Sequence, residues 1–81
     1  MTMYEVVANN CKANPQIKYS RKNLTKANSI FVASNLTRGF RQVDILNQDT
    51  GEVMYTYYMS DEFFKEEMSE YEAMELVDSC F

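Results

Sequence analysis

The stretch FRQVDILNQDTGEVMYTYYM, residues 40–59, carries the clearest structural signal in this chain of 81 residues. Its two halves alternate apolar and polar residues, a pattern typical of half-buried β-strands. Between them, Asp49 and Thr50 suit the centre of a turn, and Gly51 can adopt the left-handed conformation that follows it. The sequence therefore predicts a β-hairpin with a three-residue loop, closed by pairing of Gln48 with Glu52.

This turn sets the register of the hairpin. It places Val43 opposite Tyr57 and Ile45 opposite Tyr55, so that both cross-strand pairs lie on the same face of the sheet. A slip of one residue would move one strand's apolar side chains to the other face. The hairpin thus provides a sheet surface on which helices can pack.

The remaining elements follow from turn residues and apolar spacing. Short β-branched or alternating segments predict strands over residues 4–9 and 17–20, joined by a loop rich in Asn with one Pro. Helical spacing predicts helices over about residues 25–38 and 61–78. The order is ββαββα, which indicates a single α+β domain over residues 1–81, with a small antiparallel sheet and two helices packed on one face.

The first helix has a start signal, a stop signal and an ambiguous buried face. Thr25 is its expected N-cap and Gly39 its expected left-handed C-terminal residue. Val32 and Leu36 lie off the main stripe, so either the buried stripe is wide or these two residues mark a contact surface. The stripe expected to pack on the sheet consists of Ala27, Ile30, Phe31 and Ser34, extended by Leu24.

Charge is divided unequally along the chain. Residues 1–60 carry seven cations and four anions, a net charge of +3, whereas residues 61–81 carry one cation and eight anions, a net charge of −7. Ser60 is a suitable N-cap for the acidic helix. The predicted acidic binding residues are Asp61, Glu62, Glu66, Glu67, Glu70, Glu72, Glu75 and Asp78.

This acidic helix has two interpretations. Its carboxylates could imitate the charge of a nucleic-acid backbone and occupy a basic groove on a partner protein. Alternatively, it is a solvated amphipathic helix of ordinary composition. A match with the chain's own basic residues, within one molecule or between two copies, is a further possibility; these residues are Lys18, Arg21, Lys22, Lys26, Arg38 and Arg41.

An apolar surface is the alternative binding site. Leu46, Met54 and Tyr58 are expected on the sheet face opposite the buried tyrosines, where they either form an exposed patch or are covered by the terminal helix. Together with Val32 and Leu36, they would serve a homodimer or a subunit of a larger assembly.

Composition argues against several functional classes. Without histidine there is no Ser-His-Asp or Cys-His catalytic set, and two glycines make no phosphate-binding loop, so we expect no enzyme activity, metal or cofactor. Direct nucleic-acid binding is disfavoured by the acidic net charge of −4. The absence of a leader or of a long apolar run predicts a cytoplasmic protein with reduced Cys11 and Cys80 and no membrane partner.

The run from Leu24 to Tyr58 resembles many short proteins encoded by bacteriophages and mobile elements. The residues that carry the resemblance are Arg38-Gly39-Phe40, Val43-Asp44-Ile45 and Asp49-Thr50-Gly51-Glu52-Val53. This resemblance implies a host-takeover or counter-defence role exerted by binding, of which small acidic anti-CRISPR inhibitors are one class. The leading hypothesis is therefore a non-enzymatic inhibitor or modulator of a host nucleic-acid-handling protein.

Overall fold

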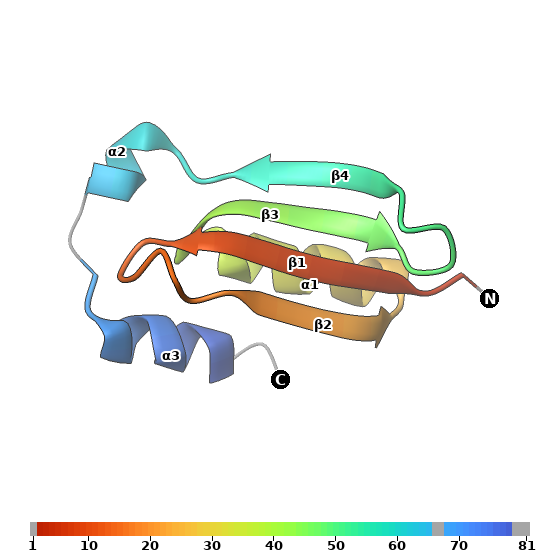
Figure 1. The fold of residues 1–81 in the computed structure, drawn as a ribbon, viewed down its shortest axis with the longest axis horizontal. Helices are drawn as coiled ribbons and strands as arrows, with labels where there is room; N and C mark the ends of the chain where they lie inside the picture. Colours follow the sequence, from red (N-terminus) through yellow and green to blue (C-terminus); the bar gives the residue numbers. More distant parts are fainter. Residues whose placement is uncertain (1, 66–67, 79–81) are drawn as a thin grey trace.

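The computed structural model describes residues 2–65 and 68–78 and shows a small α+β fold (Figure 1). A four-stranded antiparallel sheet is combined with helices, as the sequence predicts. The last helix, however, is formed in two segments. In chain order the elements are β1 (Tyr4–Cys11), β2 (Tyr19–Leu24), α1 (Lys26–Leu36), β3 (Phe40–Asn47), β4 (Val53–Tyr58), α2 (Asp61–Lys65) and α3 (Glu70–Asp78).

The strand order in the sheet is β2-β1-β3-β4, so β1 and β3 are central and β2 and β4 form the edges (Figure 1). Both predicted hairpins are present. The N-terminal one is longer than expected, since β1 continues to Cys11 through Asn10, which has a positive φ of 58°. β2 begins at Tyr19 rather than Ile17 and continues to Leu24.

The predicted register of the second hairpin is confirmed. Val43 pairs with Tyr57 and Ile45 pairs with Tyr55. On the other side of β3, Val43 pairs with Ala8. These residues lie on one sheet face, where α1 contacts the central strands β1 and β3. Tyr55 in the edge strand β4 is 43% exposed, so the expectation that it is buried is wrong.

The turn of this hairpin differs from the prediction. The loop has four residues and is closed by Asn47, whose N–H donates to the carbonyl of Glu52 at 2.8 Å. A bulge next to Leu46, which pairs with Val53, takes up the extra residue and restores the predicted register beyond it. Gly51 has a φ of 75°, as its expected left-handed role requires.

The sequence predicted the wrong buried face for α1. Thr25 does cap the helix, with its hydroxyl accepting from the N–H of Asn28 at 3.2 Å. Apolar residues occur on two sides of this helix, each with one Ala and one Ser, and the side that packs on the sheet is the one not expected from the sequence. The buried residues are Ser29, Val32, Ala33 and Leu36, whereas Ala27, Ile30, Phe31 and Ser34 are exposed.

Gly39 has a packing role instead of the predicted left-handed one. The helix ends at Leu36, its C-cap Thr37 has a φ of −64°, and Gly51 is the glycine with positive φ in the described chain. A Cβ on Gly39 would lie 2.6 Å from Cδ2 of Leu76, so the missing side chain makes room for α3.

α3 adds to the core through Ala73, which is 2% exposed, and α3 contacts α1. Met68, just before α3, packs against the same core. The expectation of two helices packed on one sheet face is therefore not confirmed, because α1 packs on the central strands whereas α3 contacts α1 (Figure 1). In the described parts of the chain, no helix has the length and apolarity needed to cross a membrane.

Candidate partner-binding surfaces

The acidic C-terminal segment is two helices, not the continuous helix that the sequence predicted. A second start occurs at Ser69, whose hydroxyl accepts from the N–H of Glu72 at 3.2 Å and whose carbonyl accepts from the N–H of Ala73 at 3.1 Å. Ser followed three residues later by Glu is the spacing of a capping box. This signal was present in the sequence and could have located the break.

The break divides the predicted row of carboxylates. Asp61 and Glu62 lie in the first turn of α2, while three other acids project from α3. Glu66, Glu67 and the side chain of Glu70 lie outside what the structure describes. The predicted acidic residues with described, exposed side chains are Asp61, Glu62, Glu72, Glu75 and Asp78.

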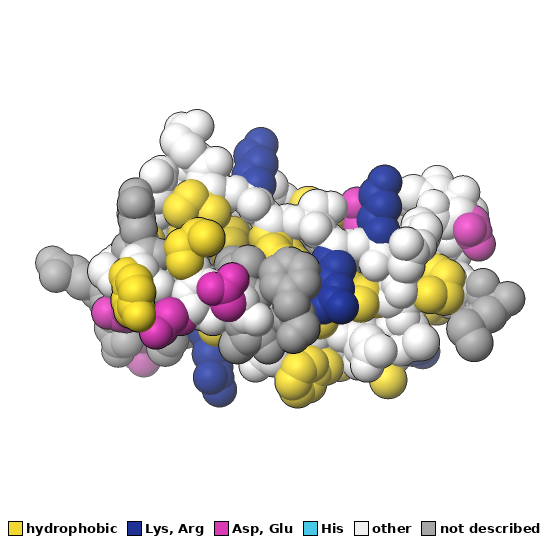
Figure 2. All heavy atoms as spheres, turned by 90° about the horizontal axis from the view of Figure 1, so that it is seen from below, with side chains coloured by type: hydrophobic (Ala, Val, Ile, Leu, Met, Phe, Trp, Pro, Cys, Tyr) yellow, Lys and Arg dark blue, Asp and Glu magenta, His cyan; other side chains and the backbone are white. Residues whose placement is uncertain are grey.

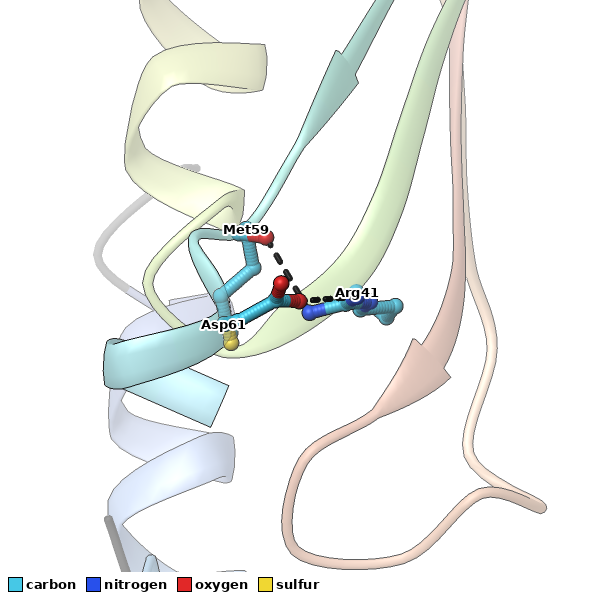
Figure 3. Close-up of polar contacts among 3 residues, drawn as sticks. All are labelled: Arg41, Met59 and Asp61. Carbon is cyan, nitrogen blue, oxygen red and sulfur yellow. Dashed lines mark hydrogen bonds and ion pairs between the residues drawn. The ribbon is translucent and has the colours of Figure 1, made fainter. Parts of the chain in front are cut away.

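Asp61 is engaged within the molecule. Its carboxylate forms an ion pair of 2.5 Å with the guanidinium of Arg41, which also donates to the carbonyl of Met59 at 3.2 Å (Figure 3). The Arg41 backbone carbonyl accepts from the N–H of Met59 at 2.9 Å. Arg41 therefore holds the end of β4 and the start of α2 against β3, which makes Asp61 a structural residue.

The outer face of α3 combines large apolar side chains with carboxylates. Tyr71 is 73% exposed and Met74 is 51% exposed, and both lie within one helical turn of Glu75. Figure 2, which views the side of the molecule on which α3 lies, shows hydrophobic and acidic side chains next to each other at one end. We call this surface, made of Tyr71, Glu72, Met74, Glu75 and Asp78, the α3 face.

The sequence predicted the charged residues of the α3 face but not its exposed apolar residues. Its carboxylates were recognised, but Tyr71 and Met74 were assigned to the apolar stripe of one long helix. The break before Ser69 rotates the following residues relative to the core, so that Ala73 points inward and Tyr71 outward. Tyrosine and methionine are enriched at protein interfaces, so their exposure among acids is a distinguishing feature of this end.

Some residues of the alternative apolar binding site are buried and the others are accessible. Val32 and Leu36 are 3% and 0% exposed, so they belong to the core and the idea that they form a contact surface is wrong. Tyr58 is 67% exposed and Met54 is 44% exposed, and Leu46 is half-buried. The last three residues therefore remain accessible on or beside β4.

The basic residues do not gather in one place. Lys18 and Lys22 lie by the edge strand β2, whereas Arg38 lines a shallow pocket at the end of the opposite edge strand β4. Arg41 is paired with Asp61. Thr37, Tyr58, Met59 and Ser60 complete the pocket.

Metal binding has no support in the described residues, among which no group of three or more Cys, Asp or Glu side chains is placed to hold an ion. Cys11 lies in the core at 2% exposure.

Comparison of the chain with protein-family models, curated proteins and solved structures finds no match in any of the three. The exposed surfaces of this molecule therefore carry the information on its function.

Proposed function

We propose that this chain is a non-enzymatic binding protein that attaches to a basic surface of a partner protein through the α3 face. The observation that supports the proposal is the exposure of Tyr71 and Met74, 73% and 51%, next to exposed carboxylates. A surface of this kind offers both apolar area and negative charge to one partner.

The two parts of the face have different tasks. Aromatic and methionine side chains that become buried supply most of the affinity of an interface, whereas peripheral charges mainly accelerate association and select the partner. Tyr71 and Met74 would thus enter an apolar depression, and Glu72, Glu75 and Asp78 would meet cations around it. Grooves that bind nucleic acid carry such cations, which supports a nucleic-acid-handling protein as the partner.

Binding in such a groove would compete with nucleic acid. The protein would then inhibit or modulate its partner by occupying the site, without any chemical step. A host-directed, counter-defence role in the host cytoplasm, with a CRISPR nuclease as partner, is the form of this function that the sequence resemblance of residues 24–58 implies.

The test is affinity capture from host extract, with the wild-type chain and a variant carrying Glu72→Lys, Glu75→Lys and Asp78→Lys. A matched control carries Asp49→Lys and Glu52→Lys, two exposed acids of the β3–β4 turn. We expect the wild type and the control to retain a protein that added nucleic acid displaces. Retention by the α3 variant, or no displacement by nucleic acid, would contradict the proposal.

A further inference from the structure

The two edges of the sheet are unequally protected against pairing with another strand. β2 carries Arg21 and Lys22, and its pairing with β1 is interrupted by a bulge. Asn23 has a φ of 62° and exchanges two hydrogen bonds with the side chain of Gln48, at 2.7 and 2.8 Å. Charge, a bulge and a covering side chain are the usual means by which proteins block an edge strand.

β4 has none of these protections over most of its length. Its sequence, VMYTYY, contains no charged residue and no proline, and five of its six residues are exposed. The bulge in its pairing with β3 lies at the Val53 end, so the segment from Tyr55 to Tyr58 is regular. An uncharged, regular and aromatic edge is a template for an additional strand.

The hydrogen-bonding groups on the free side of β4 can be assigned. The N–H of Met59 donates to the carbonyl of Arg41, so the backbone groups of Met59 point toward β3. Because the direction alternates along an antiparallel strand, Tyr57 and Tyr55 also point toward β3, and Tyr58 and Thr56 point outward.

We propose that β4 pairs with β4 of a second copy of this chain, antiparallel and centred on Thr56, joining two sheets into one of eight strands. In this register Thr56 exchanges hydrogen bonds with Thr56 of the second copy. Tyr55 then faces Tyr57 on the α1 side, and Met54 faces Tyr58 on the other side. Each pair occurs twice, as a two-fold interface requires.

Self-complementarity favours a second copy over another occupant. Residues 53–59 face only residues 53–59 of the second copy, none of which is charged. Cross-strand aromatic pairs stabilise a sheet, and the register centred on Thr56 places Tyr55 of each copy opposite Tyr57 of the other.

The available area suits a dimer of modest affinity. Tyr55 and Tyr58 are 43% and 67% exposed, and Val53 and Met54 are 49% and 44% exposed. With the strand backbone, the two copies would bury on the order of 1,000 Å², near the lower limit for specific interfaces. We therefore expect dissociation in the micromolar range.

Salt should strengthen this dimer. In the proposed register Ser60 faces Glu52 of the second copy, so Asp61 and Glu62 at the start of α2 come near this carboxylate. Added salt screens such repulsion between exposed charges.

Binding of a basic partner by the α3 face should respond to salt in the opposite direction. The two proposals use different surfaces, so either can fail while the other holds.

The test is sedimentation equilibrium of the full chain from micromolar to millimolar concentration. We expect the average mass to rise from that of one chain toward that of two. Thr56→Lys, which places two cations at the axis, should weaken association at least tenfold. The matched control Ser20→Lys, an exposed residue of β2, should leave association unchanged. A wild-type chain that stays monomeric, or a Thr56→Lys chain that associates equally well, would overturn the proposal.

Amide exchange of the wild type tests the pairing without any variant. As concentration rises, exchange at the outward N–H groups of Thr56 and Tyr58 should slow, while the N–H groups of Tyr55 and Tyr57 stay protected throughout. Association without slower exchange at Thr56 would show a dimer formed by another surface. Fast exchange at Thr56 that persists at millimolar concentration would leave the edge to a different partner. Either result would contradict self-pairing through β4.

Discussion

Arg41, in β3, forms an ion pair with Asp61, the first residue of α2, across the point where the chain leaves the sheet (Figure 3). The same guanidinium donates to the carbonyl of Met59. The contact links the basic and acidic parts of the chain within one molecule. It also sets the direction in which the acidic segment departs from β4.

This ion pair should contribute little to stability, because the Asp61 side chain is 82% exposed. We expect Asp61→Asn to lower the free energy of unfolding by about 0.2–1 kcal/mol, with a smaller loss at high salt. Urea denaturation at two salt concentrations measures the effect. Glu62→Gln, a neutralisation in the same helical turn, is the control. Equal losses in both variants would indicate a helix-dipole effect instead of an ion pair.

The buried face of α1 can be tested with a pair of truncations. Leu36→Ala removes a side chain that is 0% exposed and should cost about 2–5 kcal/mol, because it leaves a cavity in the core. Phe31→Ala removes a side chain that is 62% exposed and should change stability by no more than about 0.5 kcal/mol. Thermal denaturation distinguishes them. A larger loss for Phe31→Ala would restore the face expected from sequence.

The contact between Gly39 and α3 predicts a coupling between two residues. Gly39→Ala places a methyl group 2.6 Å from Cδ2 of Leu76, so Leu76 must move and α3 should loosen. In a Leu76→Ala background the same change should be far less costly. A double-mutant cycle by chemical denaturation measures the difference. If the losses in unfolding free energy of the two single variants simply add, Gly39 is needed for its backbone conformation and not for the approach of Leu76.

Ser69 should define the start of α3. Ser69→Ala removes the acceptor for the N–H of Glu72 and should destabilise the helix by about 0.5–2 kcal/mol, whereas Ser69→Asp keeps an acceptor and should restore it. Amide exchange at Glu72 and Ala73 reports the change locally. Unaltered exchange in Ser69→Ala would show that α3 is held by its core contacts alone.

Much of the sheet could be predicted because turn chemistry and alternation agree there. Val43 and Tyr57 are paired as expected, and the error in loop length was absorbed by a bulge. The buried face of α1 could not be obtained from periodicity, since Ile30 and Phe31 on one side match Val32 and Leu36 on the other. Each side also has one Ala and one Ser, so the packing of α1 against β1 and β3 decides which side is buried.

The binding surfaces were harder to predict because they depend on the orientation of α3. A continuous helix would have buried Tyr71 and Met74 in one apolar stripe. The restart at Ser69 exposes both and buries Ala73 instead. The negative charge was visible in the sequence, whereas its combination with exposed apolar side chains required the structure.

The most direct measurement is the affinity of the purified partner, obtained by capture, for the wild-type chain and two variants at low and high salt. One variant carries Tyr71→Ala and Met74→Ala, and the other carries Glu72→Lys, Glu75→Lys and Asp78→Lys. We predict weaker binding in both, by at least tenfold, with salt dependence lost only in the charge-reversed variant. Wild-type affinity in both variants, independent of salt, would contradict binding through the α3 face.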